Sequence, residues 1–226
     1  MLTLFGNIDS GNVHKIAMIL VERGITYRRV DVSQVRGEPR RDQYRALVPM
    51  GKVPALLLDD GDCLSESGAI LYLLAQGTAL WPTEARAQAE VLRWMFFEQY
   101  SHEPALAVLR YLRCFAPEAD RDPSRIAGLE ERSCRALSVL EGRLGAAPWL
   151  ASDMATIADF ALYPYTKWAN EAGIDLSSYP STLSWLSRFE SRPKLLALRS
   201  EGASEVLTFS EYFNGLHHHA ENRPID

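Results

Sequence analysis

The sequence has 226 residues, enough for one large domain or two small ones. Its composition, with 47% hydrophobic and 23% charged residues, is that of a globular protein and excludes a disordered or fibrous chain. The 24 basic and 29 acidic residues give a formal net charge of −5, the wrong sign for a protein whose affinity comes from phosphate contacts. We therefore expect no nucleic acid partner.

The chain shows no sign of export or membrane insertion. Its longest apolar run, 69–75, is far shorter than the roughly 20 residues of a membrane-spanning helix. The first residues resemble a strand rather than a cleavable leader. The three cysteines, Cys63, Cys114 and Cys134, have neither disulfide-framework nor metal-site spacing. We expect a cytoplasmic protein with no membrane partner and no metal.

The first 76 residues alternate between strand-like and helix-like segments. In chain order the expected elements are a strand at 2–5, a helix at 13–23, a strand at 26–32, a short charged helix at 40–47, strands at 55–58 and 62–64 around an Asp-Asp-Gly turn, and a helix from Ser67. This order, βαβ followed by αββα, predicts a thioredoxin-like α/β domain over 1–77 with a mixed four-stranded sheet.

Beyond a linker near 76–83, only helical periodicity is found. Helices are expected at 84–115, with a bend near Pro104, at 123–144 and at 157–168. They predict an all-helical (all-α) domain over 84–226. This domain should end in an unstructured polar tail, in which His217–His219 offer no geometry for a dedicated metal site.

The segment Gly51-Lys52-Val53-Pro54 stands directly before an apolar strand. One interpretation is a plain strand start, where the missing N–H of a proline is tolerated. The other is that Pro54 is cis and turns Val53 so that its N–H and C=O face outward to pair with an extended ligand. The sequence leaves both open.

The residues Glu66 and Ser67 stand at the start of a predicted helix. Ser67 is either an N-cap or part of an anion site, because free N–H groups and the helix dipole converge there. Glu66 could hold a cation beside it. A ligand that carries a carboxylate and an ammonium on one carbon, an α-amino-acid group, satisfies both.

Three motifs in this order resemble the cytosolic glutathione transferases, particularly bacterial theta-like members. They are Gly-Lys-Val-Pro at 51–54, Ser-Glu-Ser-Gly-Ala-Ile at 65–70 and Thr-Ile-Ala-Asp at 156–159. The third also fits a capping box between Thr156 and Asp159, a folding element. The resemblance implies glutathione as co-substrate, no metal or nucleotide, and a homodimer with the 84–115 helix and its apolar Trp94–Phe97 cluster at the interface.

The resemblance also implies roles for individual residues. Val53 would pair its backbone with the cysteinyl unit of glutathione, Glu66 and Ser67 would hold the γ-glutamyl end, and Lys52 would approach the glycyl carboxylate. The basic glycyl ligand of many relatives is replaced here by Pro39. Arg40 or Arg41 could substitute for it, or could simply form a charged helix face.

The residue that activates the thiol should follow the first strand. Ser10 is either a helix cap or, as the resemblance implies, the hydroxyl that donates to the sulfur and favours thiolate over thiol. The side-chain amide of Asn12 is the competing donor. No tyrosine precedes Tyr27 and no cysteine precedes Cys63, so neither type can act at this position.

The second substrate is expected to be a hydrophobic electrophile. His102 and Arg110 are candidates to contact it, with a satisfied histidine as the alternative for His102. The resemblance predicts a glutathione S-transferase. The alternatives are peroxide or disulfide reduction or isomerisation at the same site, which Asn12 would favour, and a non-enzymatic interaction scaffold.

Overall fold

The computed structural model describes residues 1–195 and 202–220, with side chains as far as residue 215. The chain divides into two compact units, one made of residues 1–70 with 197–226 and the other of residues 71–196. The division falls inside the helix at 67–75, a few residues before the linker expected at 76–83. Among the described residues, no helix combines the length and hydrophobicity that crossing a bilayer requires.

The first unit is built on a mixed sheet, as predicted. Its strands are β1 (Leu2–Phe5), β2 (Tyr27–Val30), β3 (Ala55–Leu57), β4 (Cys63–Ser65) and β5 (Glu205–Leu207), in the spatial order β4-β3-β1-β2-β5. β1 pairs parallel with β2 and antiparallel with β3, and β3 pairs antiparallel with β4. The thioredoxin-like topology is therefore confirmed, with one strand more than expected.

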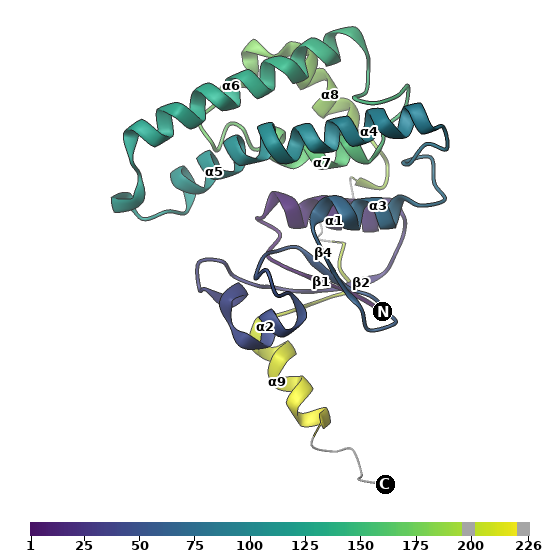
Figure 1. Cartoon of the computed structure of the whole chain (residues 1–226), viewed down its shortest axis with the longest axis vertical. Helices are drawn as coiled ribbons and strands as arrows, with labels where there is room; N and C mark the ends of the chain where they lie inside the picture. The colour runs from purple at the N-terminus through teal and green to yellow at the C-terminus, as the bar shows by residue number, and fades with distance from the viewer. Residues whose placement is uncertain (196–201, 221–226) are drawn as a thin grey trace. The chain divides into compact units, whose positions relative to one another are not determined.

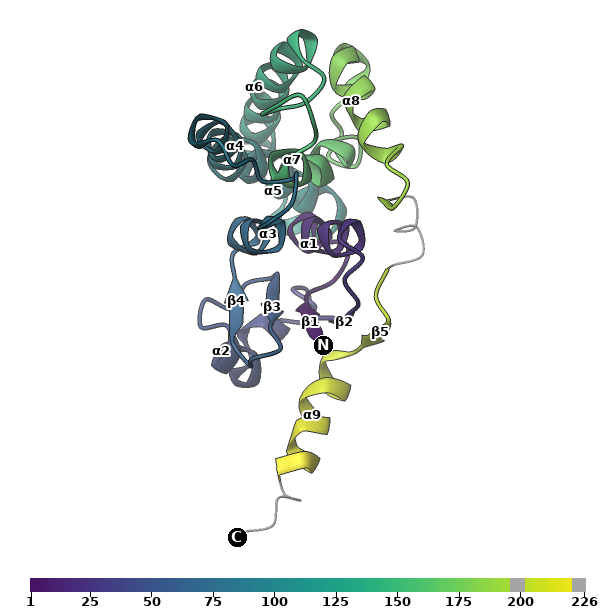
Figure 2. The ribbon, with the colours of Figure 1, turned by 90° about the vertical axis from the view of Figure 1, so that its right-hand side faces the viewer.

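Helices cover both faces of this sheet. α1 (Gly11–Glu22) and the beginning of α3 (Ser67–Ala75) lie on one face, and α2 (Asp42–Leu47) and α9 (Phe209–Ala220) lie on the other (Figures 1 and 2). The apolar face predicted for α1 is its buried face: Val13, Ile16, Ala17 and Leu20 have no exposed surface. A short 3-10 helix, Glu38–Arg40, precedes α2.

The C-terminal segment corrects two expectations, a four-stranded sheet and an unstructured tail on the helical domain. β5 extends the sheet by pairing parallel with β2, from Arg28 opposite Glu205 to Val30 opposite Leu207. α9 then brings two aromatic rings to Phe5: the ring of Tyr212 meets it edge-on at 5.2 Å, and the ring of Phe213 stacks at 6.2 Å. Burial of this aromatic face holds the segment on the first unit. His217–His219 fall in the last turn of α9, and their side chains lie outside the described residues.

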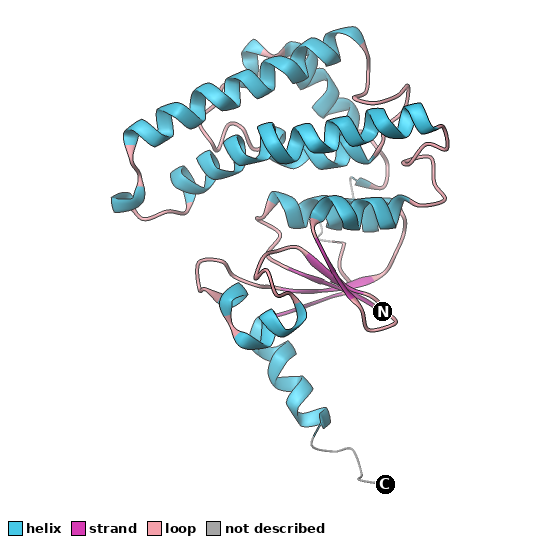
Figure 3. Ribbon diagram, viewed as in Figure 1, coloured by secondary structure: helices cyan, strands magenta, loops and turns pink. Residues whose placement is uncertain are grey.

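The second unit contains only helices and loops among its described residues (Figure 3). Its helices are α4 (Ala85–Phe97), α5 (Glu103–Cys114), α6 (Pro123–Ala146), α7 (Ile157–Lys167) and α8 (Pro180–Glu190). A π-helical turn, Glu98–His102, joins α4 to α5 and ends two residues before Pro104, near which the sequence predicted a bend. A proline has no N–H to donate, and the wider turn accommodates that loss.

The capping box at the start of α7 is confirmed, and its carboxylate is deeply buried. Asp159 accepts hydrogen bonds from the Thr156 N–H at 2.8 Å, the Thr156 hydroxyl, the Leu150 N–H and the Trp185 indole N–H. Burial raises the pKa of the Asp159 carboxyl, and these hydrogen bonds oppose that rise. One side chain thus fastens α7 to α8 and to the preceding loop.

We expect Asp159→Asn to lower the free energy of unfolding by about 2–4 kcal/mol, because the amide nitrogen would face a buried N–H donor. Chemical denaturation followed by circular dichroism measures this. Asp122→Asn is the matched control, since Asp122 caps α6 from an exposed position and asparagine caps equally well. The capping role of Asp159 would be refuted if both variants unfolded at the same denaturant concentration as the unmodified chain.

Candidate functional site

The peptide bond between Val53 and Pro54 is cis, as one of the two interpretations of the sequence predicted. The side chain of Val53 is buried. Among the described residues, neither its backbone N–H nor its C=O has a hydrogen-bond partner, although the ladder between β1 and β3 begins two residues later at Ala55. One backbone donor and one backbone acceptor are therefore available to an extended ligand. Unpaired backbone groups are rare in folded proteins, so this pair is a candidate binding feature.

The segment before Val53 is held by a residue that the sequence analysis did not single out. The hydroxyl of Tyr44, on α2, donates to the carbonyl oxygen of Lys52 at 2.7 Å. Burial raises the pKa of Tyr44 far above its ordinary value, so this hydroxyl stays protonated as a donor. Gly51 is also required here, since its φ is +57° and a Cβ would lie 2.7 Å from the Pro39 carbonyl oxygen.

The strand directions bring three segments to one edge of the sheet. β1 and β4 both end at the edge where β3 begins, because each pairs antiparallel with β3. The β3–β4 register ends with Ala55 opposite Ser65, two residues from Val53 on one strand and two from Ser67 on the other. On the other side, a Cβ added to Gly6 would lie 3.1 Å from the Val53 Cβ. The starts of α1 and α3 thus flank the Val53 backbone.

The start of α3 differs from the predicted cap. The Glu66 carbonyl accepts the first helical hydrogen bond, from the Ile70 N–H at 3.0 Å, so Glu66 occupies the cap position and Ser67 is the first helical residue. Glu66 has a φ of +70°, uncommon for a residue with a side chain and typical of strained functional positions. Glu66 is exposed and Ser67 is buried. A carboxylate side chain and unsatisfied helix N–H groups therefore stand side by side.

The start of α1 offers two polar side chains. Ser10 occupies the N-cap position with extended backbone angles, but its hydroxyl makes no cap hydrogen bond. The plain-cap interpretation is therefore wrong for its side chain. Asn12, two residues further on, accepts a hydrogen bond at Oδ1 from the Lys15 ammonium at 2.6 Å. Both side chains are half-buried.

The three basic residues considered for the glycyl carboxylate, Lys52, Arg40 and Arg41, differ in their exposure and contacts. Lys52 is exposed beside Val53. The Arg41 guanidinium lies 5.0 Å over the ring of Phe209 on α9, and Arg40 is exposed in the 3-10 helix. Arg41 thus stacks against the C-terminal helix. No group of three or more His, Cys, Asp or Glu side chains in the described part of the chain is arranged to hold a metal ion.

The two candidates for contact with the second substrate lie inside the helical unit. His102 is fully buried, and its Nε2 lies 2.8 Å from the Thr166 hydroxyl on α7. Arg110 is buried with its Nε bonded to the Glu171 carboxylate at 2.7 Å and its guanidinium 4.2 Å over the Trp168 ring. Both side chains therefore have partners within the helical unit, and their contact with a second substrate stays a prediction.

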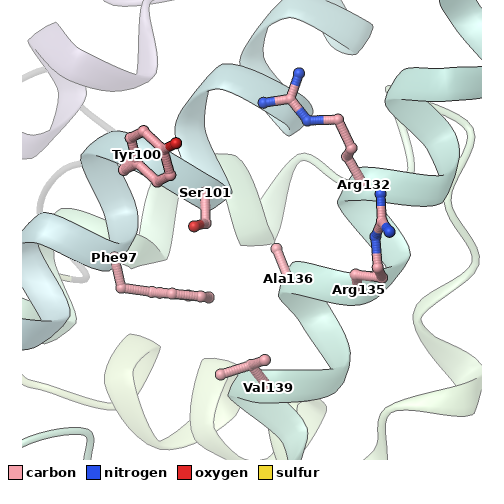
Figure 4. Close-up of a pocket in the computed structure, with 7 residues that line it drawn as sticks. All are labelled: Phe97, Tyr100, Ser101, Arg132, Arg135, Ala136 and Val139. Atoms are coloured by element: carbon pink, nitrogen blue, oxygen red, sulfur yellow. The ribbon is translucent and has the colours of Figure 1, made fainter.

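The helical unit carries an exposed apolar face with a pocket of about 480 Å³ between the end of α4 and α6 (Figure 4). Phe97 and Tyr100 line one side of the pocket, and Arg132, Arg135 and Val139 line the other. Of the apolar 94–97 cluster, Trp94 and Met95 are buried, but Phe96 is 68% exposed and Tyr100 beyond it is 84% exposed. Large exposed apolar groups of this kind mark interaction surfaces.

Comparison with known proteins decides the family. Residues 1–76 match the family model for the glutathione S-transferase N-terminal domain, and residues 105–193 match the model for the C-terminal domain. The chain belongs to the glutathione S-transferase family. A glutathione S-transferase of known structure from Pseudomonas fluorescens Pf-5 is 40% identical with a TM-score of 0.81, over 85% of this chain and 96% of that chain.

Two further relatives show how varied this family is. The disulfide-bond oxidoreductase YfcG of Escherichia coli K12 is 34% identical over 80% of this chain and 87% of its own length. The structure of Ure2p in complex with glutathione is 26% identical with a TM-score of 0.78, over 88% of this chain and 93% of that one. Family membership alone therefore does not select one reaction for this glutathione S-transferase homologue.

We expect Tyr44→Phe to weaken glutathione binding about three- to tenfold, because the Lys52 carbonyl would lose its donor and the segment before Val53 would loosen. Isothermal titration calorimetry measures the affinity. Tyr163→Phe is the matched control, because it removes a tyrosine hydroxyl bonded to Glu190 in the other unit. Equal glutathione affinities for Tyr44→Phe and Tyr163→Phe would show that Tyr44 does not shape the site.

Proposed function

We propose that the protein is a glutathione transferase that activates the glutathione thiol as thiolate for attack on a hydrophobic, electrophilic small molecule. The observation that carries the proposal is the backbone of Val53, whose N–H and C=O have no partner in the part of the chain that the structure describes, beside the starts of α1 and α3. A peptide laid along this segment gains two backbone hydrogen bonds and places its ends near groups of opposite charge.

Glutathione fits the polarity of this edge. Its cysteinyl unit would pair with the Val53 N–H and C=O. Its γ-glutamyl carboxylate would meet the N–H groups that open α3 and the Ser67 hydroxyl, while its ammonium would meet the Glu66 carboxylate. Lys52 would attract the glycyl carboxylate. The complex of Ure2p with glutathione supports this choice of ligand, because that protein shares the fold.

The sulfur would then lie at the start of α1, where Ser10 and Asn12 stand. Hydrogen bonds from the Ser10 hydroxyl and the Asn12 amide would stabilise thiolate over thiol, together with the positive end of the helix dipole. A thiol has a pKa near 8.5, and lowering it by about two units corresponds to about 2.7 kcal/mol. The thiolate attacks an electrophilic carbon, a C–S bond forms, and the leaving group departs with its electron pair.

Glutathione-dependent disulfide reduction is a second candidate, favoured by the 34% identity to a disulfide-bond oxidoreductase. In that reaction the same thiolate would attack a disulfide sulfur and release the other sulfur as a thiolate. The start of α1 carries no cysteine of its own, so glutathione would supply the attacking thiol. Asn12 would then be the principal donor to the sulfur.

We further propose a homodimer that buries the exposed apolar face around Phe96 and Tyr100. Analytical ultracentrifugation should show a dimer that Phe96→Glu converts to a monomer, because a charge at this face would lose its hydration on burial. Asp153→Glu, in the loop before α7, is a control expected to leave the dimer intact. A monomer in the unmodified chain would contradict this assembly.

Two assays separate the candidate reactions. Glutathione at several millimolar should raise the melting temperature, since a ligand that binds only the folded state stabilises it. Conjugation of a chlorinated dinitrobenzene should then exceed reduction of a small dialkyl disulfide, compared as kcat/KM. No rise in melting temperature would refute glutathione binding, and the reverse order of the two rates would favour the reductase.

We expect Ser10→Ala to retain glutathione affinity but to raise the pKa of the bound thiol by about one unit, because one donor to the sulfur is lost. Ultraviolet thiolate absorbance of the complex, titrated with pH, measures this. Ser152→Ala removes a hydroxyl in the helical unit and is the control. An unchanged pKa in Ser10→Ala, with a raised one in Asn12→Ala, would transfer the role to Asn12.

A further inference from the structure

Lys15 is a fully buried lysine one turn beyond Asn12 on α1. Lysine is almost never fully buried unless it is paired, because removing an ammonium from water costs several kcal/mol. Other charged residues of α1 show the ordinary pattern: Glu22, at the end of the helix, is partly exposed. One of the hydrogen bonds that accompany this burial runs to Asn12, a proposed site residue.

The hydrogen bond from Lys15 fixes the orientation of the Asn12 amide. The ammonium only donates, so the Asn12 atom that lies 2.6 Å from Nζ must be the carbonyl oxygen Oδ1. The NH₂ group of the same amide is then turned away from Lys15. Asn12 itself lies in the first turn of α1, two residues after Ser10.

We propose that Lys15 is a positioning residue, which holds the Asn12 amide so that its NH₂ group donates to the glutathione sulfur. This inference rests on the proposed function. A donor fixed before the ligand arrives costs no reorganisation when the thiolate forms. The Ser10 hydroxyl, which makes no cap hydrogen bond, is free to rotate. Asn12 is thereby the preorganised donor of the pair, and Lys15 also adds a positive charge beside the developing thiolate.

The test is the pKa of the glutathione thiol in the complex with the Lys15→Met variant. This substitution keeps an unbranched side chain but removes the ammonium. Ultraviolet thiolate absorbance should show this pKa raised by about one unit, a roughly tenfold loss of thiolate at a pH well below the pKa. Adding Asn12→Ala to Lys15→Met should raise it no further, because the two residues act in series. Lys15→Gln, which can still donate to Oδ1, should restore part of the loss.

Lys167→Met is the control, because Lys167 is an ion-paired lysine of the helical unit, bonded to Glu190. It should leave the pKa of bound glutathione unchanged. A thiol pKa in Lys15→Met equal to that of the unmodified protein would overturn the inference and leave the proposed function standing. Bound glutathione with no thiolate in the unmodified protein would instead refute the proposed function.

A second measurement uses the unmodified protein and stands even where Lys15→Met does not fold. In a sample labelled with ¹⁵N asparagine, the side-chain NH₂ resonances of Asn12 are assigned by their loss in Asn12→Ala. Glutathione should shift these resonances more than those of Asn170, in the helical unit. No shift at saturating glutathione would show that the Asn12 amide does not reach the ligand, and would overturn the inference.

Discussion

The unpaired backbone of Val53 is the constraint on which the rest of the first unit depends. Within residues 1–195 and 202–220, its N–H and C=O have no partner, and the segment before it is held in place: Tyr44 donates to the Lys52 carbonyl, and Gly51 allows close approach to Pro39. An open pair of backbone groups is tolerable at the edge of a sheet, where water or a ligand can satisfy them. The proposed recognition of glutathione starts from this pair.

The sheet topology turns this open pair into a site. Because β1 and β4 run in the same direction and both end where β3 begins, the helices that follow them start at the same edge. In the proposed complex, one helix start would meet the amino-acid end of glutathione through Glu66 and Ser67, and the other would meet its sulfur. Helix dipoles of the same sign then favour negative charge at two points of one ligand.

Features set by local chemistry could be predicted from the sequence, and features set by distant partners could not. The βαβ order, the hairpin, the Val53–Pro54 segment and the Thr156–Asp159 box each depend on neighbouring residues. The pairing of β5 with β2 joins segments about 175 residues apart, although the spacing of Phe209 and Phe213 is an amphipathic pattern that could have suggested a helix. The roles of Tyr44, and the burial of His102 and Arg110 against α7 and Glu171, depend on tertiary contacts that no sequence pattern fixes.

Hydrogen exchange at the Val53 amide tests the central claim most directly. In the free protein this amide should exchange faster than other amides that are equally buried, because its N–H has no acceptor among the described residues. Saturating glutathione should slow its exchange by at least about tenfold, while amides of α8 are unaffected. Glutathione that binds without slowing exchange at Val53 would contradict the account, since the ligand would then lie elsewhere.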